Sequence, residues 1–450
     1  MASERTVRVF FSAGEPSGDV HGANLIRQLL ARCDRLEAVG YGGPQMAAAG
    51  CRLHADLTAL AVMWFARVLL NLHKFWNLLW RADRYFREHR PDAVVLIDYP
   101  GFNWWIARRA KAEGIPVFYY VPPQIWAWGQ WRVKKMRRLV DHVLCALPFE
   151  ADWFRRHGCN ATLMGHPFFD EVGRRPLDEP FLERWRKQPG PLVTILPGSR
   201  TQEVTHNLPW FLKAAALVRA AVPQVRFAIA AFNSPQAEIA RAQVAASGLA
   251  IEVYAGRTAE LVRLADCCMA VSGSVSLELL AETRPTVILY FIGKTAYWVQ
   301  GWFRKVKYVT LVNMLVAEEL FPADLTPYDP GQPDAHRVLF PEYLTCEDRS
   351  PQIATHVVQW LTNARKREAL VARLAQLKAE VGQPGASARA AEYLLATLAG
   401  RPASIPRPHF PAGSAEAGPP QATPGSQAAG PCYNTPEVSG RPAKHKEMGS

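Results

Sequence analysis

The sequence predicts an α/β protein made of two Rossmann-like domains, each with a doubly wound parallel sheet, that face one cleft. Short β-rich runs alternate with helical stretches along most of the chain, which is the pattern of βαβ units. A Pro- and Gly-bearing stretch at 174–191 separates two such series. The chain has 450 residues, of which 49% are hydrophobic, and this is more than one hydrophobic core usually contains.

The predicted strands fall into two groups on either side of this linker. They are Val7–Phe11, Ala93–Ile97 and Val117–Val121, then Leu192–Leu196, Phe227–Ala231, Cys268–Val271 and Thr286–Tyr290. We therefore expect an N-terminal domain at residues 1–180 and a second domain at 181–400, whose last helices can pack back on the first. After residue 400 the composition changes to Pro, Gly, Ala and Ser, so 401–450 is predicted to be a disordered tail.

Charge and cysteine content narrow the function classes. A formal net charge of +12 suits nucleic acid, anionic lipid or a phosphorylated substrate. A nucleic-acid binder would show basic residues interleaved with stacking aromatics over a longer groove, so no nucleic-acid partner is expected. The eight cysteines lack CxxC and Cys/His zinc-ligand spacing, and the N-terminus lacks the apolar region of a signal peptide. These features predict a reduced, cytoplasmic protein.

Two predicted strand ends in the first domain carry candidate catalytic groups. The loop Ser12–Asp19 contains glycines that let backbone N–H groups approach a ligand, although a strand-to-helix turn without a ligand fits equally well. Asp98 directly follows Ala93–Ile97, and ligands of open parallel sheets bind beyond the carboxyl ends of strands. The competing role of Asp98 is a helix N-cap, but Pro100 and Gly101 are expected to delay any helix start, which favours function.

An aromatic segment follows the third predicted strand. Pro122–Trp128 leads into a basic helix that contains Arg132, and an aromatic platform beside cationic groups suits a sugar that carries a phosphate. A basic helix face exposed to solvent explains most of the positive charges of this helix equally well. Gly165–Pro167, near the domain junction, fits a turn in the core as well as a substrate contact.

Two loops of the second domain have the composition of a diphosphate site. Leu196–Arg200 presents backbone donors, a hydroxyl and a guanidinium at a strand end, and these groups stabilise a diphosphate leaving group. Val271–Glu278 ends another strand and begins a helix, where small residues admit an anion and Glu278 can accept bonds from ribose hydroxyls. Because no DxD pair occurs in the sequence, no metal is expected, and Arg200 with backbone dipoles would replace the cation.

The run 62–80 is unusually apolar and aromatic. Read as a helix, its polar side chains form one narrow stripe, so its apolar face is wider than one core contact requires. A transmembrane span is not expected, because Arg67, His73 and Lys74 interrupt the run. A buried helix or a homodimer contact remains an alternative, but tryptophans at the ends and arginines just beyond favour the membrane interface. The candidate membrane residues are Trp64, Leu69, Phe75 and Trp76.

Several motifs occur in the order found in one enzyme family. They are Gly14–Asp19, Ile97–Asn103, Trp126–Trp128, Leu147–Glu150, Leu196–Val204, Gly273–Ser274 with Glu278, Asn313 and Gly385–Ser387. With these motifs the chain resembles the lipid-A-disaccharide synthase family over residues 7–398. Each motif alone is modest support, but a chance match of the whole ordered set is improbable.

The resemblance implies a GT-B fold and an inverting glycosyltransferase of lipid A, and hence lipopolysaccharide, biosynthesis. Such an enzyme transfers 2,3-diacylglucosamine from UDP-2,3-diacylglucosamine to 2,3-diacylglucosamine 1-phosphate, and the products are a β-1,6 disaccharide 1-phosphate and UDP. No cofactor is implied. Inversion by a single displacement needs a base for the acceptor hydroxyl and stabilisation of the departing UDP. Both substrates carry acyl chains, so a peripheral position on the cytoplasmic face of the inner membrane is expected.

The resemblance also implies roles for individual residues. Asp98 is the candidate base, with Glu15 as a helper. The candidate donor-binding residues are Ser199, Arg200, Ser274, Glu278 and Asn313. The candidate acceptor-binding residues are Ser17, Trp126, Trp128 and Arg132.

One insertion departs from the family pattern, and two other functions compete with the implied one. Residues 318–338 intervene after Asn313 and repeat Leu-Phe-Pro at Leu320–Pro322, so either this copy or Leu339–Pro341 could line the site. The first alternative function is another GT-B enzyme, either a nucleotide-sugar epimerase or a glycosyltransferase with a different lipid acceptor. The second is a non-catalytic nucleotide-sugar- or lipid-binding protein. An epimerase would not need the apolar run, and the presence of Asp98 with Arg200 argues against a non-catalytic protein.

Overall fold

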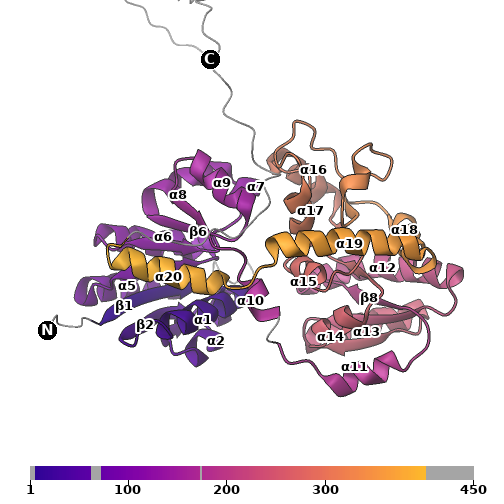
Figure 1. The fold of residues 1–450 in the computed structure, drawn as a ribbon, viewed down its shortest axis with the longest axis horizontal. Helices are drawn as coiled ribbons and strands as arrows, with labels where there is room; N and C mark the ends of the chain where they lie inside the picture. The colour runs from indigo at the N-terminus through magenta and orange to yellow at the C-terminus, as the bar shows by residue number, and fades with distance from the viewer. Residues whose placement is uncertain (1–5, 62–71, 173–174, 402–450) are drawn as a thin grey trace, which may run out of the picture. The chain divides into compact units, whose positions relative to one another are not determined.

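The computed structural model of the chain describes residues 6–61, 72–172 and 175–401. In this part of the chain, two fully parallel sheets are each packed between helices, which confirms the predicted α/β class (Figure 1). Each sheet with its helices is called a lobe below. The predicted tail begins at the end of the described residues, and Trp64 and Leu69 lie outside them.

The first lobe contains a seven-stranded sheet of order β3-β2-β1-β4-β5-β6-β7 within the described residues. Its strands are β1 (Val7–Ala13), β2 (Leu36–Gly42), β3 (Arg52–Asp56), β4 (Ala93–Ile97), β5 (Val117–Tyr120), β6 (His142–Cys145) and β7 (Ala161–Leu163). The strand order reverses between β1 and β4, whose carboxyl ends pair at Ala13 and Ile97. This reversal is the switch point at which ligands of doubly wound sheets bind.

The helices of the first lobe often begin with proline, whose fixed φ suits the first helical turn. They are α1 (Pro16–Leu30), α2 (Pro44–Ala48), α3 (Thr58–Ala61), α5 (Leu72–His89), α6 (Pro100–Ala112), α7 (Ile125–Trp128), α8 (Val133–Leu139), α9 (Pro148–Arg156) and α10 (Phe168–Val172), with the 3-10 turn η1 (Gln130–Arg132). Helix α6 starts directly at Pro100, so the expectation that Pro100 and Gly101 delay a helix was wrong. The N-cap residue is Tyr99 rather than Asp98.

The second lobe contains a six-stranded sheet of order β10-β9-β8-β11-β12-β13 in the described chain. Its strands are β8 (Leu192–Leu196), β9 (Arg226–Ala231), β10 (Glu252–Ala255), β11 (Cys267–Ala270), β12 (Thr286–Phe291) and β13 (Glu342–Thr345). Its helices are α11 (Glu179–Arg186), α12 (Thr201–Ala221), α13 (Ser234–Ser247), α14 (Thr258–Leu264), α15 (Val275–Ala281), α16 (Lys294–Phe303), α17 (Leu311–Val316), α18 (Ser350–Thr362) and α19 (Ala364–Val381), with the 3-10 turn η2 (Ala335–Arg337). The strand order reverses between β8 and β11, which pair in parallel.

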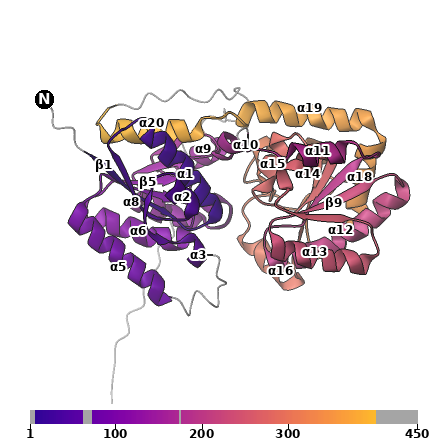
Figure 2. The same ribbon diagram turned by 90° about the horizontal axis from the view of Figure 1, so that it is seen from below.

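The last described helix, α20 (Ala386–Leu398), leaves the second lobe and packs beside α1 of the first (Figures 1 and 2). Its apolar face, which includes the fully buried Ala390 and Leu394, joins the core formed by α1 and the first sheet. The carboxylate of Asp170 accepts N–H bonds from Gly385, Ala386 and Ser387 and so caps the start of α20. The two ends of the described chain therefore complete a single core.

Candidate active site

The carboxyl ends of β1 and β4 bring Glu15 and Asp98 to the same edge of the first sheet. Ala13 pairs with Ile97; Glu15 follows Ala13 by two residues, and Asp98 follows Ile97 by one. Asp98 and Tyr99 both adopt positive φ values of 45°, a conformation that is unfavourable for residues other than glycine. The Tyr99 ring lies over Gly14, where a β-carbon would come within 2.2 Å of it. This tight turn holds the Asp98 side chain at the strand end.

A buried amide holds the backbone of this turn. Asn103 donates to the carbonyls of Ser12, Ile97 and Asp98 at 3.2, 3.2 and 2.7 Å, and its Oδ1 accepts from the Ser12 hydroxyl at 2.7 Å. The Tyr119 hydroxyl donates a second bond of 2.7 Å to the Asp98 carbonyl. These bonds hold the backbone of Asp98, and its carboxylate, which accepts a backbone bond from Tyr99, keeps further acceptor capacity for chemistry.

The carboxyl group of Asp98 has the electrostatics of a general base. Burial raises its pKa to about 7, and the negative charge of Glu15 adds to this increase. Burial and the same Glu15 charge raise the pKa of the adjacent Tyr99 hydroxyl. A carboxylate with a pKa near neutral pH accepts a proton more readily than an ordinary aspartate, because proton affinity increases with pKa.

A third carboxylate, Glu150, lies near Asp98 and was not among the residues selected from the sequence. It is fully buried at the start of α9, where it accepts N–H bonds from the Trp126 indole at 3.2 Å and from Ala146 at 3.0 Å. Burial raises its pKa to about 7, and the charge of Asp98 adds to the shift. The available sequence signal was the motif Leu147–Glu150, in which Pro148 starts a helix and an acidic residue follows in the first turn.

The aromatic segment after β5 separates into a buried and an exposed part. Trp126 has no exposed surface, and its ring contacts Phe149 edge to face at 5.0 Å. It cannot serve as a sugar platform in this arrangement, and it positions Glu150 instead. Trp128 is 40% exposed, and the exposed Arg132 stacks over Trp131, with its guanidinium carbon 5.4 Å from the ring centroid. Trp128 and Arg132 are thus accessible to a ligand.

The first turn of α1 combines an exposed serine with a structural aspartate. Ser17 is the second residue of the helix and is exposed. The carboxylate of Asp19 accepts N–H bonds from Gly43, Gln45 and Met46 at 2.8 to 3.0 Å, and it caps the start of α2. The Asp19 side chain therefore maintains the shape of the loop, whereas Ser17 is free to contact a ligand.

In the second lobe, the loop after β8 exposes a guanidinium. Gly198 has a φ of +117°, and a β-carbon there would come within 2.5 Å of the Glu203 side chain. The Glu203 carboxylate accepts the N–H groups of Ser199 and Arg200 at 3.0 and 3.2 Å. The Arg200 side chain is 77% exposed and 3.6 Å from Glu203, so most of its donors are available to an anion.

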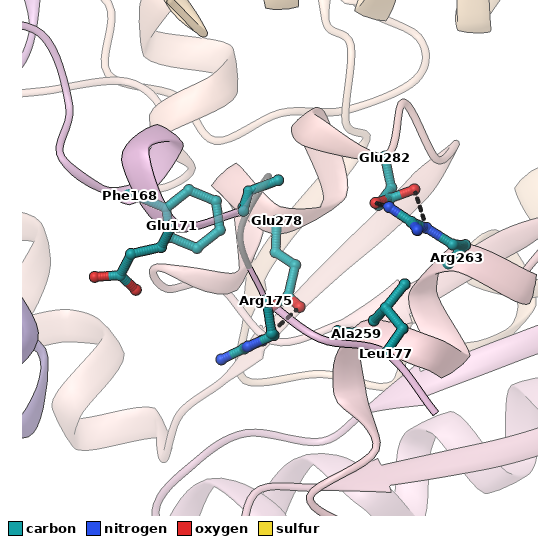
Figure 3. Close-up of a pocket in the computed structure, with 9 residues that line it drawn as sticks. Phe168, Glu171, Arg175, Leu177, Ala259, Arg263, Glu278 and Glu282 are labelled. Atoms are coloured by element: carbon teal, nitrogen blue, oxygen red, sulfur yellow. Dashed lines mark hydrogen bonds and ion pairs between the residues drawn. The ribbon is translucent and has the colours of Figure 1, made fainter. Parts of the chain in front are cut away.

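The loop after β11 leads to a pocket that contains Glu278 (Figure 3). Ser274 is exposed at the N-cap position of α15. Glu278 forms an ion pair of 3.3 Å with Arg175, and burial raises the pKa of Glu278 while Arg175 opposes that effect. Figure 3 shows this pair, with Arg263 bonded to Glu282 further along the same pocket. The pocket is lined by Phe168, Glu171, Val172, Arg175, Leu177, Ala259, Arg263, Glu278 and Glu282.

Asn313 is a structural anchor in this arrangement. Its amide nitrogen donates to Phe340 O at 2.7 Å and Glu342 Oε2 at 2.8 Å, while its Oδ1 accepts from the N–H groups of Leu339 and Phe340. These bonds use the full capacity of the amide, so direct contact with a donor would require breaking one of them. The contacts also identify Leu339–Pro341, rather than Leu320–Pro322, as the copy of the repeated segment that joins the second sheet at β13.

Within residues 6–61, 72–172 and 175–401, no helix is long and apolar enough to cross a bilayer. The same residues contain no cluster of three or more His, Cys, Asp or Glu side chains arranged to hold a metal ion.

Two parallel α/β lobes, with polar groups after β1 and β4 in one and after β8 and β11 in the other, define a GT-B protein. Solved structures agree on this fold. UDP-GlcNAc 2-epimerase from Neisseria meningitidis, bound to UDP-GlcNAc, superposes with a TM-score of 0.57 at 10% identity over 88% of this chain and all of that chain. The glycosyltransferase of kitacinnamycin gives a TM-score of 0.54 at 17% identity, covering 87% of this chain and 99% of that one.

Sequence relatives identify the family. The model of the lipid-A-disaccharide synthetase family matches residues 9–379. The lipid-A-disaccharide synthase of Myxococcus xanthus is 34% identical over 84% of this chain and 94% of its own length. That of Alkalilimnicola ehrlichii is 35% identical over 84% of this chain and 99% of its own length. The chain belongs to the lipid-A-disaccharide synthetase family, which confirms the resemblance found in the motifs and makes it a glycosyltransferase of lipid A biosynthesis.

Proposed function

We propose that the chain transfers 2,3-diacylglucosamine from UDP-2,3-diacylglucosamine to 2,3-diacylglucosamine 1-phosphate with inversion at the anomeric carbon. The observation that supports this reaction best is Asp98, a partly buried carboxyl group with a pKa of about 7 at the switch point of the first sheet. An inverting transfer needs one such base, and Asp98 has the position and proton affinity for it. Family membership supports the identity of the sugar and the lipid.

The reaction proceeds in a single displacement. Asp98 takes the proton of the acceptor 6-hydroxyl while the oxygen of that hydroxyl forms a bond to C1 of the donor sugar. The bond between C1 and the diphosphate oxygen breaks on the opposite face, and its electron pair leaves with UDP. The Arg200 guanidinium stabilises the charge that develops on the diphosphate, because charge-assisted bonds to a phosphate are strong and Arg200 is exposed for the contact.

The two lobes divide the substrates in this proposal. Residues 1–180 bind the acceptor through Ser17, Trp128 and Arg132, and residues 181–400 bind the donor. Ser199 and Ser274 contact the phosphates, and Glu278 accepts bonds from the ribose hydroxyls after release from Arg175. Burial raises the pKa of Asp98, and the negative charge of Glu15 adds to this increase. Neither the Trp126 nor the Asn313 side chain is free to reach a substrate, so both act as positioning residues. Trp126 positions Glu150, and Asn313 positions the start of β13 through Glu342.

We further propose that the chain binds the cytoplasmic face of the inner membrane through α5. Trp76 and Trp80 are both about half exposed, and their rings lie 6.4 Å apart. Phe75 is half buried and contacts Phe102 at 5.8 Å, so part of this run supports the core instead. Trp76→Ser with Trp80→Ser should therefore reduce vesicle binding without unfolding, whereas Phe75→Ser should reduce stability. A homodimer remains a separate prediction, to be measured by light scattering.

The test of the reaction uses the purified intact chain with both substrates, followed by mass analysis of the products. We expect the disaccharide 1-phosphate and UDP in equal amounts, and none in the absence of the acceptor. An epimerase would instead interconvert the UDP-sugar without acceptor. A non-catalytic binding protein would bind UDP-diacylglucosamine in calorimetry and return it unchanged, and either result would overturn the proposal.

A further inference from the structure

Helix α16, Lys294–Phe303, is a second surface with unusual exposure. None of its ten residues is buried. Trp298 and Trp302 are each 65% exposed, and Val299 and Phe303 are at least half exposed. Monomeric proteins seldom leave such large apolar side chains together in water, because their burial is favourable by about 25 cal/mol per Å². The helix therefore has a surface that a partner would cover.

The apolar side chains of α16 form one continuous face. Trp298 and Trp302 are four residues apart, as are Val299 and Phe303, and this spacing places each pair on the same side of a helix. The two indole rings lie 4.7 Å apart. In the described chain, none of these four side chains belongs to a hydrophobic core cluster or packs against one. Figure 2 shows α16 at the margin of the second lobe.

The helix is nevertheless fixed at its end. Arg304, which follows α16, is buried and donates to the carbonyl of Leu325. Lys307 pairs with Asp334 at 2.6 Å. Leu325 and Asp334 both belong to the 318–338 insertion. Arg373 of α19 holds this insertion by donating to the carbonyls of His336 and Arg337. The insertion thus anchors the base of α16, so the exposed face is held in place and is not a frayed end.

The charge around α16 indicates which partner it fits. No Asp or Glu occurs from residue 283 to residue 317, whereas this segment contains five Lys or Arg residues. Lys294 and Lys305 are exposed at the two ends of the helix, and no carboxylate pairs with them in the described part of the chain. Indole rings flanked by lysines suit the headgroup layer of an anionic bilayer. A symmetric contact between two copies of α16 would instead bring these positive charges together.

We propose that α16 is a lipid-binding surface of the second lobe, which inserts Trp298, Trp302 and Phe303 into an anionic bilayer. This surface is separate in sequence from α5, so each lobe would have its own membrane contact. The proposal does not depend on the assigned reaction, because vesicle binding is measured without substrates. A failed transferase assay would therefore not contradict the proposed lipid-binding surface. Failed vesicle binding would likewise not contradict the proposed reaction.

The test measures binding of the intact chain to vesicles of phosphatidylcholine with and without phosphatidylglycerol. The variant Trp298→Ser/Trp302→Ser/Phe303→Ser should bind at least ~10-fold more weakly, because the aromatic contact is lost. Lys294→Gln with Lys305→Gln should weaken binding only to vesicles that contain phosphatidylglycerol.

The matched control, Leu217→Ser with Phe232→Ser, removes two other exposed apolar side chains of the same lobe and should bind as the wild type does. Wild-type binding by the triple Ser variant would overturn the proposal. So would a dimer that the same substitutions dissociate, because α16 would then contact a second copy.

A second measurement needs no substitution. Hydrogen exchange of the α16 amides in the wild-type chain should slow when phosphatidylglycerol vesicles are added. Unchanged exchange in this helix would reject the surface even if the triple Ser variant failed to fold.

Discussion

Replacement of Asp98 by Asn tests the base assignment most directly, because it preserves the shape of the side chain and removes its proton affinity. General-base catalysis typically contributes 10²–10⁴-fold, so turnover should fall by about 10²-fold or more, which corresponds to at least ~2.7 kcal/mol of transition-state stabilisation. The wild-type kcat/KM should decline about tenfold per pH unit below the Asp98 pKa of about 7. The variant should lack this acidic limb.

The same substitution should affect stability in the opposite direction. The folded pKa of Asp98 is about 7 and its unfolded reference value is 3.8, so between these values the folded chain retains a proton that the unfolded chain has released. Stability attributable to this group therefore falls as pH rises from 3.8 to about 7, and the cost persists above that range. Asn carries no charge and avoids the cost. Asp98→Asn should thus be more stable than wild type above pH 7, and the difference should vanish near pH 3.8.

The assay combines disaccharide formation at acceptor concentrations below KM, which gives kcat/KM, and at saturation, which gives turnover, with thermal unfolding over the same pH range. A folded Asp98→Asn variant with near-normal turnover would remove Asp98 from the mechanism. An unchanged acidic limb would show that another group sets the pH dependence, and Glu150 is the candidate because its pKa is also about 7. The control variant Asp152→Asn alters an exposed carboxylate of α9 and should leave rate and pH profile unchanged.

Three further predictions concern Glu15, Arg200 and Asn313. Glu15→Gln removes a negative charge near Asp98, so the acidic limb of kcat/KM should shift to lower pH, and an unshifted profile would exclude this coupling. Arg200→Ala should weaken UDP binding in calorimetry by about tenfold or more, while wild-type activity persists in chelator. A strict requirement for magnesium or manganese would contradict the role of Arg200. Asn313→Ala removes one of the bonds to the buried Glu342 carboxylate and the side-chain bonds to the backbone of Leu339 and Phe340, so urea unfolding should show a loss of about 2–4 kcal/mol, and a loss below about 0.5 kcal/mol would refute the anchor.

The fold was predictable wherever strands are buried on both faces. β4 and β8 occur at their predicted bounds, because five consecutive apolar or β-branched residues leave little ambiguity. β2 was not predicted, since its glycines resemble a turn in the sequence. Gly40 in β2 has a φ of +143°, and a β-carbon there would come within 2.0 Å of Phe11 O. The glycine permits close approach to β1, a requirement that appears only when both strands are in place.

The candidate site was predictable in position but not in hydrogen bonding. Asp98 could be selected because it directly follows an apolar strand. The saturation of Asn313 depends on Leu339 and Phe340, and the burial of Trp126 depends on Glu150, so neither follows from local sequence. The start of α6 was misread for a different reason. Tyr99 adopts a left-handed conformation that no local pattern predicted, and this allows Pro100 to begin the helix at once.

The packing of α20 against α1 has a consequence for the order in which the chain folds during synthesis. Residues 31–385 separate the two helices along the chain. At a translation rate of 5–20 residues per second, α20 emerges from the ribosome roughly 20–70 s after α1. Throughout that interval the apolar surface of α1 that later contacts Ala390 and Leu394 has no cover. The core of the first lobe is therefore completed only when the last described helix is made.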